Sequence, residues 1–188
     1  MKNILLVFTI CFLFSCENEA EDNRLDWIQE IDKTILDYNK NAKIEQEGFV
    51  GVDKDYSILK IFKKNNDGYQ KNIIKSNDSI NNVAIIMEIY TLNGEIVLQN
   101  FNGLFPLLYK GAKEESDPCC QLFERSIYYK NNQQGKAYFK QLKIKNSENE
   151  NKFKDDLEIL PMLEIDDFNV SDEYFRTKSQ LHKLKAQL

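Results

Sequence analysis

The dipeptide Asn93-Gly94 most constrains the fold, because it lies in the middle of a strand-like run over residues 83–101. Asn-Gly readily adopts the positive φ angles of a type I′ turn, which joins two antiparallel strands tightly. We therefore expect a β-hairpin that turns at these two residues. Two other turn-forming segments, 65–68 and 131–135, separate further strand-like runs. The sequence therefore predicts three hairpins in succession.

The central hairpin is expected to have two chemically different faces, because successive side chains of a strand point to opposite sides of a sheet. With a two-residue loop, Tyr90 pairs with Val97 and Ile89 pairs with Leu98. The apolar face then carries Ile85, Met87, Ile89, Thr91, Ile96 and Leu98. The mixed face carries Glu88, Tyr90, Leu92, Glu95, Val97, Gln99 and Phe101. We expect the apolar face to be buried and the mixed face to be partly hydrated.

Residues 24–42 have the period of an amphipathic helix. The apolar stripe consists of Leu25, Ile28, Ile31, Ile35, Tyr38 and Ala42. We expect this stripe to pack on the apolar face of the hairpin, with Trp27 at its edge or serving as an anchor for a partner. The chain from Ser171 has a weaker helical pattern among many Lys and Gln residues. We expect a short C-terminal helix there that docks weakly.

The expected fold class is α+β. The N-terminal helix packs on a curved antiparallel β-meander of about six to eight strands, and a short C-terminal helix follows. Residues 24–188 form a single domain. The segment 103–116 is expected to be an edge strand or a covering loop, because Pro106 cannot donate a hydrogen bond to a central ladder.

The first sixteen residues have the pattern of an export signal. Lys2 precedes an apolar run over residues 4–13 that is too short to span a bilayer but fits a signal peptide. The run ends in Leu-Phe-Ser-Cys, which resembles the lipobox of bacterial lipoproteins, although Phe14 is bulkier than the small residue usual there. The resemblance implies that residues 1–15 are cleaved off and that Cys16 carries lipid. An ordinary signal peptide is the alternative.

The lipoprotein resemblance also implies a location. A lipidated, palmitate-bearing Cys16 would anchor the protein in the bacterial cell envelope, at the outer membrane, facing the periplasm or the cell surface. Residues 16–23 are polar and acidic, and we expect them to be a flexible tether or a surface-export tag. The expected partners are the membrane, through the lipid, and a protein of the envelope. Nucleic acid is not expected, because the formal net charge is −5 and an acidic surface repels phosphate.

Two of the four cysteines remain after export and lipidation, namely Cys119 and Cys120. Adjacent Cα atoms are closer than a disulfide usually allows, so a vicinal disulfide would be strained. The alternatives are two half-buried thiols, a strained vicinal disulfide, or a metal or redox site. The last would lack further Cys or His ligands.

No catalytic, cofactor or metal motif stands out in the sequence. His182 is the only histidine, and its Lys-rich surroundings favour an exposed surface position. The acidic clusters at 155–156 and 164–167 are of the kind found in solvated loops. We therefore expect no enzyme activity, no cofactor and no metal.

The order of elements is similar to a class of uncharacterised exported bacterial domains in which a helix precedes aromatic-rich hairpins. The segments 87–97 and 124–132 carry this resemblance, which covers roughly residues 24–145 and implies a fold without catalytic residues. The first functional hypothesis is a lipid-anchored binding or accessory protein that presents Tyr90, Val97 and Phe101 to a partner. The others are an immunity or inhibitor lipoprotein against an exported toxin, and an enzyme on a helix-plus-curved-sheet scaffold.

Overall fold

The computed structural model describes residues 24–41, 43–52, 55–63, 68–78, 83–106, 118–145 and 155–187. The predicted signal peptide (1–15), the predicted lipid-attachment residue Cys16 and the predicted tether (16–23) lie outside the described residues. The side chain of Cys119 lies outside them as well. The expectations about these residues therefore stay predictions.

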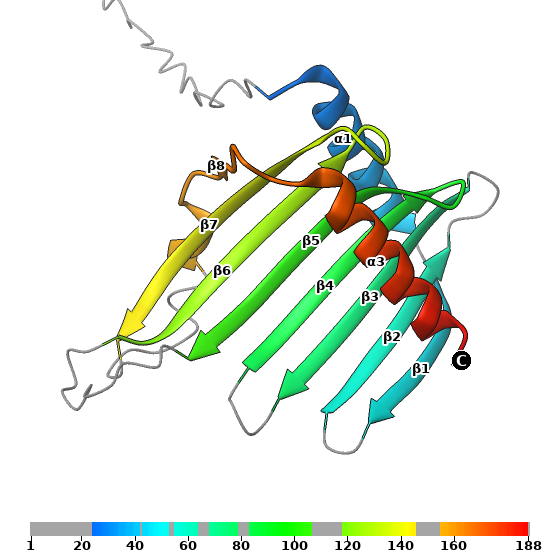
Figure 1. Cartoon of the computed structure of the whole chain (residues 1–188), viewed down its shortest axis with the longest axis horizontal. Coiled ribbons are helices and arrows are strands. Elements are labelled where there is room, and N and C mark those ends of the chain that lie inside the picture. The colour runs from blue at the N-terminus through cyan, green and yellow to red at the C-terminus, as the bar shows by residue number, and fades with distance from the viewer. Residues whose placement is uncertain are drawn as a thin grey trace, which may run out of the picture.

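An eight-stranded antiparallel sheet forms the centre of the described part of the chain (Figure 1). Its strands are β1 (Lys43–Val52), β2 (Asp55–Lys63), β3 (Tyr69–Asp78), β4 (Val83–Leu92), β5 (Glu95–Pro106), β6 (Pro118–Tyr129), β7 (Gly135–Lys145) and β8 (Leu163–Glu164). Each strand pairs with the strands next to it in the sequence, so the sheet is a simple meander. In the sequence, one helix precedes the strands and another follows them. The fold is therefore α+β, and the predicted fold class is confirmed.

Two helices cover opposite faces of the sheet. Helix α1 (Asp26–Asn41) lies behind the strands in Figure 1, and α3 (Val170–Lys185) crosses in front of them. The alternation along β4 agrees with this placement, because Tyr90 belongs to the core cluster under α1 and Ile89 to the cluster under α3. The sheet therefore has an α1 face and an α3 face.

Helix α1 buries much of the stripe that its sequence predicts. Ile28, Ile35 and Tyr38 are buried, and Trp27 and Ile31 pack against the same cluster, so Trp27 does lie at the edge of the buried face. The sheet residues of this cluster are Tyr69, Tyr90, Leu98, Tyr128 and Tyr138. The helix therefore packs on the face predicted to be mixed, and not on the predicted apolar face.

A β-bulge in the central hairpin changes which residues of β5 lie on each face. The turn is as predicted, with φ angles of 50° at Asn93 and 86° at Gly94. The pairing then shifts, because Tyr90 pairs with Leu98 instead of Val97. One extra residue moves the following side chains to the opposite face. The predicted partners of Tyr90 and Ile89 are thus wrong by one residue.

After the bulge, the residues of β5 are redistributed between the two faces. Leu98 joins Tyr90 under α1, whereas Gln99 pairs with Ile89 on the α3 face. Phe101 pairs with Met87 and packs against the same cluster as Ile89, so it also lies on the α3 face. Val97 packs against the cluster under α1.

Helix α3 docks more firmly than its sequence suggests. The side-chain oxygen of Asn169 caps the helix by accepting a 3.1 Å hydrogen bond from the backbone N–H of Asp172. Tyr174, Thr177 and Leu181 are buried against the sheet. Asp172 also lies in the first turn, where a negative charge stabilises the helix dipole. The expectation of weak docking was therefore wrong.

Strand β5 also extends further than predicted. It continues through Gly103 to Pro106, so this part is a strand and not a loop. Gly103 and Leu104 pair on both sides, whereas Phe105 and Pro106 pair only with β6, so the predicted edge position is right for these last two residues. Residues 107–116 lie outside the described residues. The ladder with β4 ends at the pair Ala84–Leu104, and Pro106 pairs only with Cys120 of β6. A proline is tolerated at such a position because one side of the strand has no ladder to complete.

Candidate functional site

A row of four side chains crosses the α3 face of the sheet beside the first turn of the helix. Phe101 of β5 pairs with Arg125 of β6, which pairs with Phe139 of β7, and Phe139 pairs with Leu163 of β8. Directly paired residues of antiparallel strands share a face and contact one another. Phe101 packs against the cluster under α3, so the whole row lies on that face. We call these four residues the Phe–Arg row.

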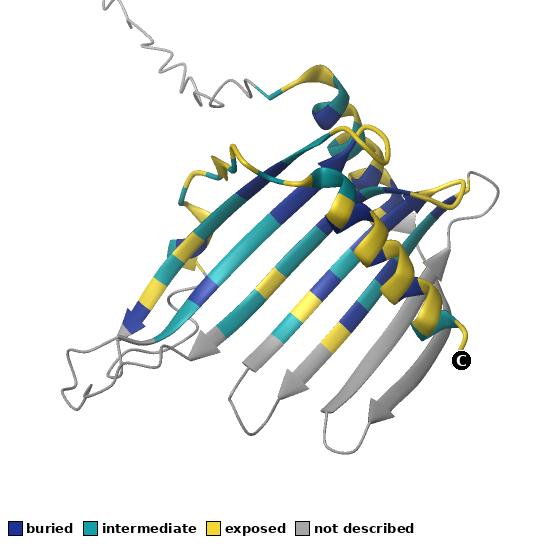
Figure 2. Cartoon of the chain, viewed as in Figure 1, coloured by how far each residue is buried: buried dark blue, intermediate teal, exposed yellow. Residues whose placement is uncertain are grey.

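The Phe–Arg row is only partly covered. Phe101, Arg125 and Phe139 are intermediate in burial, and Leu163 is 55% exposed. Figure 2 shows the same pattern, since much of β5 and β6 away from α3 is intermediate in burial. A half-exposed group of aromatic and aliphatic side chains around an arginine has the composition of a contact surface.

Arg125 is held in position by an aromatic ring and a carboxylate. Its guanidinium carbon lies 4.4 Å from the centre of the Phe101 ring, within the range of a cation–π contact. Its Nη2 is 3.5 Å from Oε1 of Glu173 on α3. Burial lowers the pKa of Arg125, and the charge of Glu173 opposes that shift. The guanidinium remains charged, because even a lowered arginine pKa leaves it protonated.

Arg125 also retains unused hydrogen-bonding capacity. Its Nε is buried and has no hydrogen-bond partner among the described residues. The side chain as a whole is 27% exposed. A partly desolvated guanidinium has lost some contact with water without gaining a full set of protein acceptors. It would therefore gain from an additional acceptor on a bound partner.

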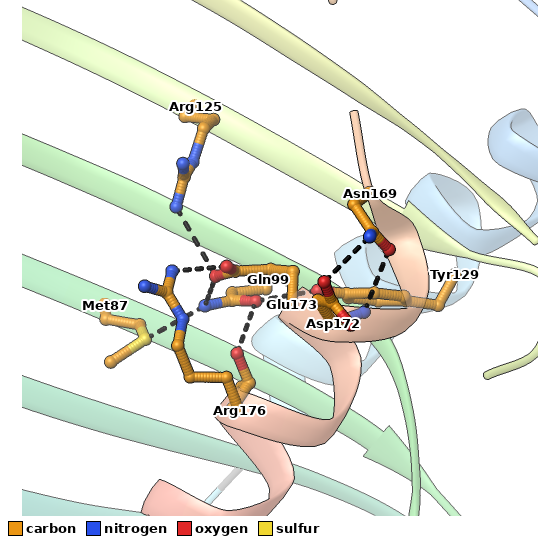
Figure 3. A network of polar contacts seen from close by, with 9 residues as sticks. Met87, Gln99, Arg125, Tyr129, Asn169, Asp172, Glu173 and Arg176 are labelled. Carbon is orange, nitrogen blue, oxygen red and sulfur yellow. Dashed lines mark hydrogen bonds and ion pairs between the residues drawn. The ribbon is translucent and has the colours of Figure 1, made fainter. Parts of the chain in front are cut away.

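The carboxylate of Glu173 links two arginines (Figure 3). It forms ion pairs with Arg125 and with Arg176, which lies three residues later on α3. Its own side chain is almost inaccessible, whereas that of Arg176 is exposed. Two positive charges and one negative charge leave this end of the Phe–Arg row locally positive on an acidic protein.

A buried polar cluster fixes α3, and with it Glu173, against the sheet. The side-chain oxygen of Gln99 accepts hydrogen bonds from the Tyr129 hydroxyl at 2.9 Å and from the Thr177 hydroxyl at 3.0 Å. The amide nitrogen of Gln99 donates to the Met87 sulfur at 3.2 Å. Burial raises the pKa of Tyr129, and the charge of Glu173 adds to the shift, so Tyr129 stays a neutral donor.

The predicted partner surface of Tyr90, Val97 and Phe101 does not exist as one surface. Tyr90 is 1% exposed under α1, and its hydroxyl donates a 2.8 Å hydrogen bond to Glu88. Burial, followed by the charge of Glu88, raises the pKa of Tyr90. Val97 is half-buried on the same face, whereas Phe101 lies on the opposite one. The bulge at Val97 is the physical reason, and only Phe101 belongs to the Phe–Arg row.

The other residues singled out in the sequence are not brought together. His182 is exposed on α3, and Cys120 is a half-buried thiol. Glu164 forms an ion pair with Lys136 and does not form a site with a second acidic residue. Within the described ranges, no group of three or more His, Cys, Asp or Glu residues is placed to hold a metal ion. None of the helices that the structure describes is long and apolar enough to cross a membrane.

Sequence reasoning missed Arg125, Phe139, Leu163 and Glu173. A usable signal was present in β6, where Phe123, Arg125 and Ile127 occupy alternate positions. An arginine between two apolar residues on one strand face must lie in or beside an apolar surface. Glu173 had no comparable signal, because its role depends on where α3 docks.

Comparison with protein-family models, with curated proteins and with solved structures found no match for this chain.

Proposed function

We propose that this chain is a lipid-anchored binding or accessory protein of the bacterial cell envelope, and that the Phe–Arg row binds its partner. Cys16 provides the anchor. The observation that supports the binding role is the position of Arg125, which is partly desolvated, stacked on Phe101 and short of one hydrogen-bond acceptor. This arrangement is suited to recognition, because such arginines and aromatic side chains often dominate the energy of binding interfaces.

The chemistry of the row indicates the kind of partner. Phe101, Phe139 and Leu163 offer apolar area, and Arg125 with Arg176 offers positive charge that exceeds the charge of Glu173. The complementary surface is a protein segment with a carboxylate next to an apolar side chain. The overall net charge of −5 would repel a strongly acidic partner, so the charge match is local.

The test is a pull-down from detergent-solubilised envelopes with a tagged, Cys16-anchored protein. We expect Arg125→Met and Leu163→Ser to weaken capture of the partner at least about tenfold, the loss that follows when a central contact is removed. Lys130→Met is a matched control, because Lys130 is exposed in the β6–β7 turn away from the row. Capture that is equal for Arg125→Met and the native protein would refute the proposal. Loss of palmitate labelling in Cys16→Ala is the result expected for the anchor.

A second candidate function is immunity to, or inhibition of, an exported toxin. The observation that favours it is the acidic net charge of −5 on a small single domain, since such charge accelerates binding to basic enzymes. Protection of cells against a toxin from related bacteria is the expected result. Equal survival of cells with and without the protein, across such toxins, would count against this function.

A further inference from the structure

The α3 face of the sheet continues beyond the Phe–Arg row, on the side away from the helix. Along β5, Gln99 lies beneath α3, Phe101 belongs to the row, and Gly103 follows two residues later on the same face. Gly103 pairs with Ile85 of β4 and with Phe123 of β6, and all three residues are intermediate in burial. Among the described elements, only α3 crosses the strands on this side of the sheet (Figure 1). We call Ile85, Gly103 and Phe123 the second row.

The described charges around the two rows are mostly positive. Arg176 and Lys183 follow Glu173 at three and ten residues, so they lie on the side of α3 that faces the rows, and both are exposed. Lys143 follows Phe139 by four residues on β7, so it shares the face of the rows and is exposed as well. The cations are Arg125, Lys143, Arg176 and Lys183, and the acids are Asp172 and Glu173. More cations than acids surround the rows, so this part of the face is positive on an acidic protein.

The exposed acids at 166–167 do not belong to this surface. The segment before them pairs with β7, where Leu163 is opposite Phe139. Two residues later, the N–H of Ile165 donates a 2.8 Å hydrogen bond to the backbone oxygen of Ala137, so the segment runs toward the β6–β7 turn. The two acids therefore follow on the turn side of the Phe–Arg row, whereas the second row lies on its other side.

The sheet determines the conformation of a segment that binds on the two rows. The backbone N–H and C=O groups of β4, β5 and β6 are used in pairing with neighbouring strands along both rows, so the face offers only side chains as partners. An extended segment laid on these side chains would bury its own backbone polar groups without partners, which is costly. A helix satisfies its backbone internally and turns an apolar stripe toward the sheet, as α3 does. The favoured occupant is therefore a helix.

The two rows also define where the side chains of such a helix contact the sheet. Glycine has no side chain, so Gly103 leaves room between Ile85 and Phe123 for a side chain of a partner. Arg125 is the diagonal neighbour of Gly103, and such neighbours lie about 7–8 Å apart. Side chains three or four residues apart on a helix are about 5–6 Å apart. One helix can therefore place an apolar side chain over Gly103 and a carboxylate at Arg125.

We propose that the two rows bind an acidic amphipathic helix of the partner protein, packed beside α3, with an apolar side chain over Gly103 and a carboxylate at Arg125. This inference rests on the proposed function, because it takes the Phe–Arg row as the binding surface. It adds the conformation of the bound segment and its sequence pattern. The segment carries Asp or Glu three or four residues from a large apolar residue, and further acids face Arg176, Lys183 and Lys143.

Designed peptides test the conformation and the charge of the occupant. Fluorescence anisotropy measures their binding to the acylated full-length chain in detergent, with empty micelles as the background. The probe is a stapled helix of about four turns with a leucine stripe flanked by glutamates. A second peptide carries lysine in place of every glutamate, and a third carries prolines that prevent a helix. We expect the acidic helix to bind at least about tenfold more tightly than either of the others.

Protein variants locate the binding on the two rows. Gly103→Leu fills the space between Ile85 and Phe123, so we expect it to weaken binding of the acidic helix at least about tenfold. Asn102→Leu is the matched control, because Asn102 is exposed on the opposite face of the same strand, and it should leave the affinity unchanged. Arg125→Met should weaken binding as strongly as Gly103→Leu. Urea unfolding shows whether each variant is folded.

The outcomes separate this inference from the proposed function. Equal affinities of the acidic helix and the proline peptide, or of the native protein and a folded Gly103→Leu, would overturn the helix and leave the proposed function standing. Absence of binding by the acidic helix would do the same. Equal affinities of the native protein and Arg125→Met would overturn both. Self-association of the native chain in sedimentation, lost in Gly103→Leu, would assign the rows to a second copy and overturn the helix. The comparison of the peptides needs no variant, so it decides the question if Gly103→Leu does not fold.

Discussion

The hydroxyl of Tyr129 donates a 2.9 Å hydrogen bond to the side-chain oxygen of Gln99, and both residues are sealed from water beneath α3. Thr177 of α3 donates to the same oxygen. A buried amide or hydroxyl without a partner is costly, so this one oxygen satisfies two donors from two different elements. The cluster therefore joins β5, β6 and the C-terminal helix.

The first prediction follows from this shared acceptor. Gln99→Leu preserves the approximate size of the side chain but leaves two buried hydroxyls without an acceptor. We expect it to lower the free energy of unfolding by about 2–4 kcal/mol. The triple variant with Tyr129→Phe and Thr177→Val removes the stranded donors and should recover most of the loss. Urea unfolding measures both, and a triple variant less stable than Gln99→Leu would contradict this account.

The second prediction concerns the docking of α3. Leu181 is buried against the sheet, so Leu181→Ala should cost about 2–4 kcal/mol of unfolding free energy. Phe175 is exposed and keeps an edge-on contact with Tyr174, so Phe175→Ala should cost about 1 kcal/mol or less. Urea unfolding monitored by circular dichroism measures both changes in unfolding free energy. Similar costs for the two variants would mean that α3 does not dock through this face.

The third prediction compares two glycines that the fold requires for different reasons, Gly94 for its positive φ and Gly135 for lack of space. A Cβ at Gly94 would meet nothing within 4 Å, so Gly94→Ala costs only its strained positive φ, about 1–2 kcal/mol. A Cβ at Gly135 would collide with the backbone oxygen of Tyr128 and crowd Val170 at the start of α3. Because backbone cannot move aside cheaply, Gly135→Ala should cost more than Gly94→Ala. Thermal unfolding ranks the two, and the reverse order would refute the steric argument.

The fourth prediction is a pH dependence that arises at Glu95. Hydrogen bonds from Tyr174 and then from Lys178 hold the pKa of Glu95 below its usual value. A carboxyl whose pKa is lower in the folded state stabilises the protein above its unfolded pKa, about 4.3, and that stabilisation is lost as the pH falls through the folded value. Solvent screens this exposed pair, so the contribution is at most about 1 kcal/mol.

Glu95→Gln tests this assignment. The variant should be slightly less stable than the native protein at pH 7, and the difference should shrink as the pH is lowered from 5 to about 3. Unfolding in urea at several pH values measures the difference. Two stability curves that stay parallel over this range would show that Glu95 contributes no linkage.

The fold class could be predicted from the sequence because the strongest signals in the sequence are local. Asn93-Gly94 forms the turn that its φ preference predicts, and the apolar period of α1 predicts the burial of Ile28 and Ile35. The bulge at Val97 has no such local signal. An extra residue changes no periodicity that can be seen before the partner strand is known, yet it reverses which face Leu98 occupies.

The candidate site was harder to predict, because it depends on contacts between distant parts of the chain. Thr177 is polar and lies outside the apolar pattern of α3, but it is buried because Gln99 accepts its hydrogen bond. Arg125 meets Glu173 only after α3 has crossed the sheet. Local patterns place each of these residues on an element, but only the packing of the elements brings them together.

The strictly sequential order of the sheet has a consequence for how the chain can fold. Every described strand pairs with the strand before or after it in the sequence, and at most 17 residues separate two paired strands. The entropic cost of closing each connection is therefore modest. A chain that is synthesised from its N-terminus could form one hairpin at a time, before its C-terminal helix is complete. Gln99 would then remain in contact with water until the last element, α3, arrives. The docking of α3, which completes the packing of the domain, would thus coincide with release of the chain.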